Sequence, residues 1–442
     1  MAAPVAQLAS TALLTDHYEL TMLEAAIGSG TARHRAVFEV FCRHLPPGRR
    51  YGVLGGVGRL VDDLAAFRFG PEQLDHLARA GVVSGTTLDW LAGYRFSGTV
   101  LGYREGEPYF PGSPVLTVDG PFAEGLVLET LVLSVLNHDS AIAAAGARMV
   151  AAAKGRALLE AGSRRTHEWA AVAAARAAYL VGFAGTSNLE AGRRFGVPTG
   201  GTASHAFTLA YADERAAFAA QARAMGPTTT MLVDTYDVEV GIHNAVAVAG
   251  PHLGGVRIDS GDLAVEARHA RDLLDGLGAR ETEIVVSGDL DEHGIARLAQ
   301  APVDRMLVGA HLVSGAGHPS AGLVYKLVAV ADEPGRDAPL HPVAKRSVGK
   351  TSRGGVKFTA RAIGPDGRAT AELVASTPEA FDLLEGGTRA LQAPVLADGR
   401  AVPGLADLEA ARRHHRRALA ELPQVALELE DGEAALVLLD LG

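Results

Sequence analysis

The sequence contains a single cysteine, Cys42, among its 442 residues. One cysteine cannot form a disulfide within the chain, and it cannot supply a metal site built from several thiolates. So little cysteine is typical of proteins that work in a reducing compartment. We therefore expect a cytoplasmic protein without structural disulfides.

Positive charge is also in short supply. The chain has 41 Lys and Arg against 51 Asp and Glu, which gives a formal net charge of −10 at pH 7. Proteins that bind the phosphate backbone of nucleic acids usually carry an excess of basic residues. The composition therefore argues against nucleic acid as a partner.

Long apolar runs are missing as well. The stretch 126–136 is interrupted by Glu129 and ends at Asn137, well short of the roughly 20 apolar residues that span a bilayer. The first 20 residues lack the basic segment and apolar segment of a signal peptide. We expect neither a membrane segment nor a signal peptide.

What the sequence does have is enough apolar material for a large core. Hydrophobic residues make up 48% of the chain and charged residues 21%, which excludes disorder, collagen and coiled coil.

Domains average about 150 residues, so we expect the chain to fold into two or three. Residues 1–122 mix helical and strand-like segments and predict an α+β domain. Residues 336–442 hold short strand-like pieces and a charged helix, and we expect them to pack back on the first region.

The middle region, 123–335, has a different pattern. Alanine-rich helical periodicity over 124–160 predicts two helices. Further on, short apolar runs alternate with helical stretches, at 180–185, 231–234, 256–259, 284–288 and 306–309. Continuous apolar strands that alternate with helices indicate a parallel α/β sheet, for which we favour a barrel. Functional groups of such sheets lie at the carboxyl ends of the strands.

The segment 256–263 (VRIDSGDL) is the sharpest local signal, because a strand ends in two carboxylates and a glycine. Asp259 at this place suits a sugar diol, Mg²⁺ or phosphate, and Arg257 suits an anionic group of the substrate. An aspartate that caps the next helix, followed by a turn glycine, is the alternative. Asp234 and Asp237 repeat the pattern, and their spacing places both near one helix N-terminus. This segment also looks like a sugar-binding loop of another fold, which we interpret as a coincidence of chemistry because the flanking sequence is wrong for that fold.

Two later strands run into small residues, at 284–290 (IVVSGDL) and 306–312 (MLVGAHL). Parallel barrels commonly bind a phosphate at this position through backbone N–H groups. The alternative is two unrelated turns.

His205 follows a turn rich in glycine and hydroxyl residues, where an imidazole could accept a phosphoryl group. A packed or solvated histidine is the alternative. Arg164, after a helical stretch, could anchor a phosphate or carboxylate, or it could simply complement a helix end. His414 and His415 lie in a basic run that we interpret as a solvated helix end, not as a metal site.

Taken together, these motifs resemble the nicotinate phosphoribosyltransferase family, in order and over most of the chain. The segments that carry the resemblance are 15–22 (TDHYELTM), 38–43 (FEVFCR), 128–130 (LET), 136–138 (LNH), 162–168 (GSRRTHE), 185–188 (GTSN), 201–205 (GTASH), 232–237 (LVDTYD), 256–263, 323–328 (LVYKLV) and 344–350 (AKRSVGK).

The resemblance implies a type II phosphoribosyltransferase. Its fold would be an incomplete parallel α/β barrel with a second α+β domain built from both chain ends. It would convert nicotinate and 5-phosphoribosyl pyrophosphate to nicotinate mononucleotide and pyrophosphate in NAD biosynthesis and salvage. ATP hydrolysis would be coupled through a phosphohistidine, with Mg²⁺ as the ion. The enzyme would act as a homodimer with active sites at the interface.

The resemblance also assigns roles to individual residues. His205 would be the phosphorylated histidine, next to the substrate contact Thr202, and Asp259 would meet the ribose. Nicotinate would lie against Tyr18, from either subunit, and its carboxylate would meet Arg257. Arg164 would bind on the ring or phosphate side, and the residues expected to hold the 5-phosphate are Gly288, Asp289, Gly309 and Ala310.

Ser187 lies where nicotinamide-using relatives carry an acid, so a neutral residue there favours the acid substrate over the amide. The sequence departs from the family at Ala161, where many relatives have a large side chain, and at Leu307 and Ala310 in the phosphate loop. These departures concern affinity for nicotinate and the geometry around the 5-phosphate.

Three other interpretations remain. The same fold could use nicotinamide or quinolinate, or it could be a non-catalytic sensor of nucleotides. The joint presence of Tyr18, His205, Arg257 and Asp259 speaks against lost catalysis. A metal-dependent barrel hydrolase would need clustered histidine ligands, and the sequence has no His-x-His or His-Glu-x-x-His motif.

Overall fold

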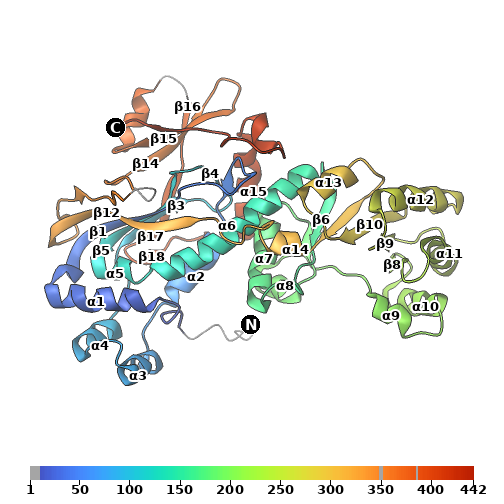
Figure 1. Cartoon of the computed structure of the whole chain (residues 1–442), viewed down its shortest axis with the longest axis horizontal. Helices are drawn as coiled ribbons and strands as arrows, with labels where there is room; N and C mark the ends of the chain where they lie inside the picture. Colours follow the sequence, from blue (N-terminus) through green and yellow to red (C-terminus); the bar gives the residue numbers. More distant parts are fainter. Residues whose placement is uncertain (1–9, 348–351, 385–386) are drawn as a thin grey trace. The chain divides into compact units, whose positions relative to one another are not determined.

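The computed structural model describes residues 10–347, 352–384 and 387–442 (Figure 1). The chain divides into two compact units. The first unit is made of Met1–Ala141 and Ser320–Gly442, and the second of Ile142–Pro319. The domain boundaries expected after residues 122 and 335 remain a prediction.

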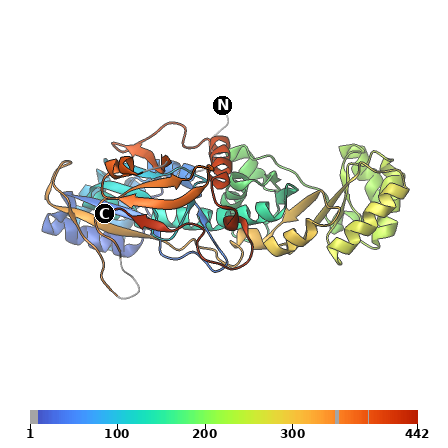
Figure 2. The same ribbon diagram turned by 90° about the horizontal axis from the view of Figure 1, so that it is seen from above.

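The second unit is built on a parallel sheet of six strands. In chain order these are β6 (Ala157–Glu160), β7 (Gly185–Thr186), β8 (Thr230–Leu232), β9 (Gly255–Ile258), β10 (Glu283–Gly288) and β11 (Arg305–Val308). The helices between and after them are α7 (Glu168–Val181), α8 (Leu189–Phe195), α9 (His205–Leu209), α10 (Glu214–Met225), α11 (Val238–Ala249), α12 (Leu263–Gly276), α13 (Glu292–Leu298) and α14 (Ala310–Val313). Figure 2 shows α10, α11 and α12 grouped beside one another.

The strand order of this sheet is that of a barrel with one open seam. In space the order is β7-β6-β11-β10-β9-β8, so the last strand, β11, pairs with the first, β6. That pairing closes a circle of consecutive strands everywhere except between β7 and β8. Within this unit, all of whose residues are described, β7 and β8 share no ladder. The predicted incomplete parallel α/β barrel is confirmed.

Two details of the predicted elements are wrong. Residues 157–160 form strand β6, not the end of a helix, because Lys154 and Gly155 adopt left-handed backbone angles (φ 49° and 89°) after α6. The expected strand at 180–185 is instead the end of α7, which Gly182 terminates, and β7 is only two residues long. The other four predicted strands are present as β8, β9, β10 and β11.

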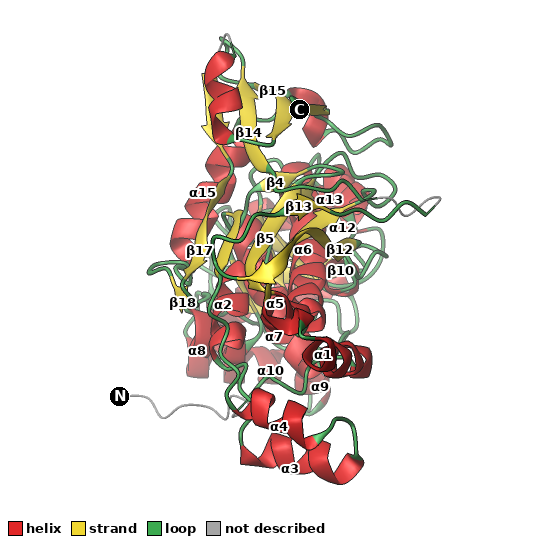
Figure 3. Ribbon diagram, turned by 90° about the vertical axis from the view of Figure 1, so that its left-hand side faces the viewer, coloured by secondary structure: helices red, strands yellow, loops and turns green. Residues whose placement is uncertain are grey.

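The first unit contains the second α+β fold, built on a seven-stranded sheet from both ends of the chain (Figure 3). Its strands, in spatial order, are β13 (His341–Pro342), β12 (Leu323–Pro334), β1 (His34–Cys42), β5 (Pro114–Pro121), β3 (Thr99–Tyr103), β17 (Gln392–Ala397) and β18 (Arg400–Ala401). Gln392 of β17 pairs with Tyr103 of β3, so the C-terminal segment completes a sheet that the N-terminal segment begins.

Two smaller sheets and several helices accompany it. The sheets are β16 (Gly387–Ala390), β14 (Phe358–Ile363), β15 (Ala369–Ala375) and β19 (Leu438–Asp440), and the pair β2 (Gly52–Val53) and β4 (Pro108–Tyr109). The helices are α1 (His17–Ser29), α2 (Val57–Ala65), α3 (Pro71–Ala80), α4 (Gly85–Ala92), α5 (Phe122–Leu126), α6 (Glu129–Ala152), which continues into the second unit, and α15 (Leu408–Ala420). Short 3₁₀ helices occupy Thr31–Arg33, Pro378–Leu383 and Gln424–Leu427.

The core of the first unit forms between the large sheet and its helices. The Phe38 ring stacks on Tyr325 at 5.0 Å between centroids, and the Tyr325 hydroxyl donates a hydrogen bond to Gly125 O at 2.8 Å. Each such aromatic buries on the order of 150–250 Å² of surface. These contacts hold β1, β12 and α5 together.

One helical stretch, Phe122–Ala152, is long and apolar enough to cross a membrane by length and composition alone. Of its most apolar window, 67% is buried inside the protein. A helix that is hydrophobic on most sides and already buried is typical of a protein core.

Candidate functional site

The candidate site lies at the carboxyl ends of the parallel strands in the second unit. Because parallel strands all end at the same edge, the residues that follow them are brought together. The strand pairings place Gly288 beside Val308, and Val308 beside Glu160. Of the residues singled out from the sequence, Ser187, Asp259, Asp289 and Gly309 follow directly after these strand ends.

Arg257, in β9, is the centre of the polar contacts at this edge. Its Nε donates to Ser287 Oγ at 2.7 Å, and its Nη1 donates to Thr202 Oγ1 at 3.0 Å and to Ala203 O at 3.2 Å. Its Nη2 lies 3.4 Å from Asp259 Oδ1. The other two guanidinium nitrogens are hydrogen bonded to protein, so a substrate carboxylate would reach Arg257 through Nη2, which it would share with Asp259.

Asp259 is held from two sides. Its Oδ1 accepts a hydrogen bond of 2.5 Å from Ser287 Oγ, and its backbone N–H donates to Asp234 Oδ2 at 2.8 Å. The side chain remains 32% exposed. The result is a fixed negative charge that a ligand can reach.

Asp234 is a member of this site to which the sequence interpretation assigned no specific role. Its side chain is 1% exposed, and its Oδ2 also accepts from Ser260 Oγ at 2.7 Å. Its Oδ1 is buried without a hydrogen-bond partner. A buried, unsatisfied carboxylate oxygen is costly, which marks a place prepared for a donor or a cation. The signal in the sequence was the repeated strand-then-aspartate pattern itself.

His205 begins α9 and lies against both carboxylates. Its Nε2 is 3.8 Å from Asp259 Oδ2 and 4.0 Å from Asp234 Oδ1, while its Nδ1 makes a 3.2 Å hydrogen bond with Thr235 Oγ1. The side chain is 41% exposed. One ring nitrogen is thus held by the protein, and the other faces the acidic side of an open site.

The other two aspartates of these segments are helix caps. Asp237 Oδ1 accepts from Val240 N at 2.9 Å at the start of α11, and Asp262 Oδ1 accepts from Ala264 N at 3.1 Å at the start of α12. Gly261 provides the left-handed turn (φ 80°) between Asp259 and its capping neighbour. Asp262 is therefore a helix cap, as the alternative interpretation of this segment expected. For Asp259, a role in binding the substrate stays a prediction.

The residues expected around the 5-phosphate come together at the ends of β10 and β11. Gly288 ends β10 and Asp289 follows it, both exposed, and Gly309 and Ala310 follow its neighbour β11. The backbone of Ala161 lies beside these residues, because its N–H donates a hydrogen bond to Val308 O at 2.8 Å.

Ser187 and Arg164 lie after β7 and β6, and both are exposed. The Ser187 N–H donates to Glu160 O at 2.8 Å. The Glu160 carboxylate accepts hydrogen bonds from Gly162 N and Thr186 Oγ1, so one buried side chain fixes both loops. Burial raises the pKa of Glu160 above its usual range, against the effect of the Thr186 hydrogen bond.

Tyr18 belongs to α1 of the first unit, where it is 45% exposed. Partial burial, followed by the negative charges of Glu129 and Glu19, raises the pKa of Tyr18 to about 12. Its ring is therefore neutral and accessible.

A divalent cation would find few protein ligands here. Among the described residues no three His, Cys, Asp or Glu side chains form a metal-binding group. The unpartnered Asp234 Oδ1 and the nearby Asp259 Oδ2 make a pair of oxygen ligands. Mg²⁺ commonly binds through one or two carboxylates together with water and substrate phosphates, and this donor set fits that pattern.

The first unit has a basic cavity of about 580 Å³ that the sequence interpretation missed. Arg43, Arg353 and Lys357 line it, and Lys357 Nζ pairs with buried Glu39 at 2.6 Å. Cys42 also borders it, and burial raises the pKa of its thiol to about 11, so the thiol is unreactive. The motif 344–350 lies partly outside the described residues.

The interpretation of His414 and His415 as a solvated helix end is wrong. His415 is 2% exposed, and His414 Nε2 makes a 2.7 Å contact with the buried Glu107. Their place on the inner face of α15, not their sequence neighbours, decides their burial.

Comparison with known proteins points to the family that the sequence motifs resemble. A family model described as the nicotinate phosphoribosyltransferase (NAPRTase) N-terminal domain matches residues 13–137. A nicotinate phosphoribosyltransferase of Mycobacterium tuberculosis is 53% identical over 432 residues, covering 96% of this chain and 94% of that protein. The solved human nicotinic acid phosphoribosyltransferase matches with a TM-score of 0.80 and 28% identity, over 96% of this chain and 97% of that one.

A nicotinate-nucleotide pyrophosphorylase from Pyrococcus furiosus shares the fold, with a TM-score of 0.76 and 23% identity over 95% of this chain and 98% of that one. At the identity and coverage of the mycobacterial relative, the resemblance noted in the sequence is confirmed, and the chain belongs to the nicotinate phosphoribosyltransferase family.

Proposed function

We propose that the chain catalyses the transfer of a phosphoribosyl group from 5-phosphoribosyl pyrophosphate to nicotinate, in NAD biosynthesis and salvage. Family membership supports this activity. The observation in the structure that carries it is the cluster of His205, Asp234, Arg257 and Asp259 at one edge of the parallel sheet.

Asp259 is suited to the sugar. Breaking the bond between the anomeric carbon and pyrophosphate builds positive charge on the ribose, and catalysis gains most from a fixed anion beside it. Hydrogen bonds from Ser287 and from its own backbone to Asp234 hold Asp259 in place before substrate arrives. No reorganisation of this charge is then needed during the reaction.

Nicotinate recognition would be shared between charge and shape. Nη2 of Arg257, which also pairs with Asp259, offers a donor to a carboxylate, and Ser187 brings no negative charge that would repel it. The exposed, neutral ring of Tyr18 provides a stacking surface.

ATP coupling would use His205. With Nδ1 hydrogen bonded to Thr235, Nε2 is the nitrogen available to accept a phosphoryl group. Asp234 and Asp259 would hold Mg²⁺, which neutralises phosphate charge when bound. The same two carboxylates would repel a phosphorylated His205 unless a cation lies between them, so phosphorylation and metal binding should be linked.

We also propose a cytoplasmic homodimer with active sites at the interface. Several large apolar side chains of the second unit are exposed, and contact with a second subunit would remove them from water. They include Leu209, Tyr236, Val240 and Val265.

The activity is tested by incubating the purified chain with 5-phosphoribosyl pyrophosphate, Mg²⁺ and ATP and supplying nicotinate, nicotinamide or quinolinate in turn. We expect mononucleotide, measured by mass, with nicotinate and at least about tenfold less kcat/KM with the other two. Preference for another base would contradict the assigned substrate, and no product with any base would favour a nucleotide sensor.

The phosphohistidine is tested with His205→Ala. This variant should lose ATP stimulation and retain slow, ATP-independent synthesis, while exposed His252 changed to alanine should behave as wild type. Unchanged ATP stimulation in His205→Ala would refute the coupling role.

A further inference from the structure

A second polar cavity, of about 390 Å³, lies in the first unit. It is formed by the turn before β4, by β16 with the start of β17, and by one face of α15. The polar residues that line it are Arg104, Glu107, Arg389, Gln392, His414, Arg417 and Glu421, and its apolar lining is Ala390, Leu391, Ala393 and Ala418.

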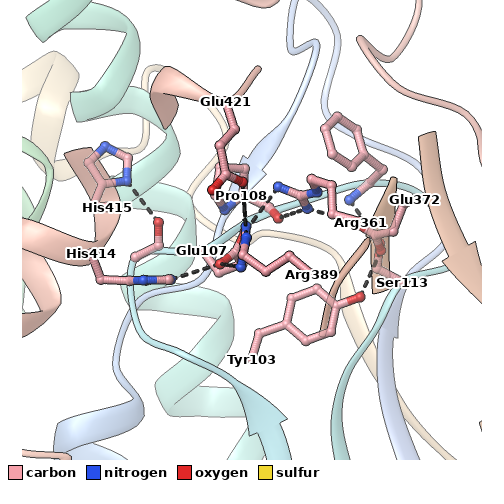
Figure 4. A network of polar contacts seen from close by, with 12 residues as sticks. Tyr103, Glu107, Pro108, Ser113, Arg361, Glu372, Arg389, His414, His415 and Glu421 are labelled. Carbon is pink, nitrogen blue, oxygen red and sulfur yellow. Dashed lines mark hydrogen bonds and ion pairs between the residues drawn. The ribbon is translucent and has the colours of Figure 1, made fainter. Parts of the chain in front are cut away.

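Glu107 is the buried carboxylate of this cavity, and its negative charge is already paired with cations of the protein. Glu107 is 1% exposed and accepts from Arg361 Nη1 at 2.9 Å, from Arg389 Nη1 and Nη2 at 3.0 and 2.8 Å, and from His414 Nε2 at 2.7 Å. Figure 4 shows Arg389 held between Glu107 and Glu421. Arg389 Nη2 also contacts Glu421 at 2.7 Å. The two acids of the cavity are therefore both neutralised by protein cations.

Two further arginines line the same cavity and take no part in these ion pairs. Arg104, in the turn after β3, and Arg417, on α15, are exposed, and within the described residues neither guanidinium has a hydrogen bond or an ion pair. With Glu107 and Glu421 satisfied by Arg389, Arg361 and His414, these two groups give the cavity a surplus of positive charge. Guanidinium groups bind phosphate oxygens through paired N–H donors.

We propose that this cavity is a binding site for a phosphorylated small molecule, whose phosphate lies between Arg104 and Arg417. The volume exceeds what inorganic phosphate alone would fill, and the alanine and leucine lining offers the rest of the molecule an apolar wall. The site binds and does not catalyse, because its one buried acid, Glu107, is occupied by four donors and cannot act as a base.

The test uses the full chain and glycerol 3-phosphate as the probe, with glycerol as its uncharged counterpart. Hydrogen exchange read by mass spectrometry locates binding, and titration calorimetry gives the affinity. We expect glycerol 3-phosphate, and not glycerol, to slow exchange in peptides covering residues 104–109 and 411–421.

The matched variants are the double change Arg104→Gln with Arg417→Gln, and Arg413→Gln as a control on the same helix that does not line the cavity. The double variant should lose protection at 411–421 and at least about tenfold in affinity at this site, while Arg413→Gln should keep both. Peptides from residues 200–310 report any binding at the reaction site separately.

Three results would overturn the proposal. These are no protection at 411–421 in the wild-type chain, equal protection in the double variant, or equal protection by glycerol. A double Arg→Lys variant guards against misfolding, because it keeps the charge and should retain part of the protection. Failure here would leave nicotinate phosphoribosyl transfer untouched, since none of these residues is among those assigned to the reaction site.

Discussion

Asp234 and Asp237 lie three residues apart, yet the protein uses them differently. Asp237 caps a helix, whereas Asp234 supports Asp259 and keeps one oxygen free beside His205. Asp259 and Asp262 divide the same way one strand later. Sequence spacing shows that each pair flanks a helix start. Which member turns toward the neighbouring strand is decided only by the pairing of the sheet.

Ser187 gives the first prediction. Changing Ser187 to Asp places a negative charge where we propose that nicotinate's carboxylate lies, so kcat/KM for nicotinate should fall by at least about tenfold, or ~1.4 kcal/mol. Use of nicotinamide should rise, because the acid can accept its amide N–H. Steady-state kinetics with both bases measure this, with neutral Ser187→Asn as the control. Equal losses in the two variants would show that size, not charge, matters at this position.

His415 gives a prediction about pH. Burial lowers the pKa of His415 to about 4, from an ordinary value of 6.5, despite its hydrogen bond with Gly106 O. The unfolded chain therefore takes up the proton first, and stability present above pH 6.5 is lost as the pH falls towards 4. His415→Asn can keep the donor to Gly106 without titrating. Urea unfolding between pH 4 and 7 should give a flatter stability profile for this variant, and a profile as steep as wild type would contradict the assignment.

At the scale of elements, the four strands β8 to β11 could be predicted from sequence because each is a continuous apolar run that ends in polar or glycine residues. The two that could not, β6 and β7, follow alanine-rich helices whose periodicity hides them. The Arg257 contacts could not be predicted either, since Thr202 and Ser287 approach it from segments 55 and 30 residues away.

The capping of α12 gives the third prediction. Asp262→Ala should lower the free energy of unfolding by about 1 kcal/mol, because it leaves two backbone N–H groups without their acceptor. Its kcat should stay close to wild type. Asp259→Asn should do the reverse, with kcat lowered by at least about tenfold and stability nearly unchanged. Denaturant unfolding and steady-state kinetics on both variants test these two roles. A larger loss of kcat in Asp262→Ala than in Asp259→Asn would contradict them.

At the scale of the whole molecule, a buried charge network joins segments that are hundreds of residues apart. Arg361 bridges Glu107 and Glu372, and Glu372 accepts hydrogen bonds from Tyr103 and Ser113 (Figure 4). Nothing in the local sequence around any of these residues predicts the others, because the partners meet only when the chain ends share one fold.

This network gives the fourth prediction. Burial alone would raise the pKa of Glu107, but hydrogen bonds from His414 and Arg389 outweigh it and lower the pKa to about 2, from 4.5. A lowered carboxyl pKa contributes stability above the unfolded value and loses it as the pH falls from about 4.5 to 2. The contribution is on the order of 3 kcal/mol.

The measurement is urea unfolding at pH 7 and pH 3. Glu107→Gln should cost several kcal/mol at pH 7, since it leaves buried cations without their partner, and should show a smaller further loss at pH 3 than wild type. Exposed Glu379→Gln is the control. An acid response in Glu107→Gln equal to that of wild type would place the pH sensitivity elsewhere.

The pairing of β11 with β6 has a further consequence for how such a protein can evolve. The polypeptide enters the barrel and leaves it through adjacent strands, so the barrel resembles an insertion into a host fold whose own sheet is completed on both sides of the interruption. Recombination could therefore replace the second unit as one continuous segment without changing the order of the strands in the first unit.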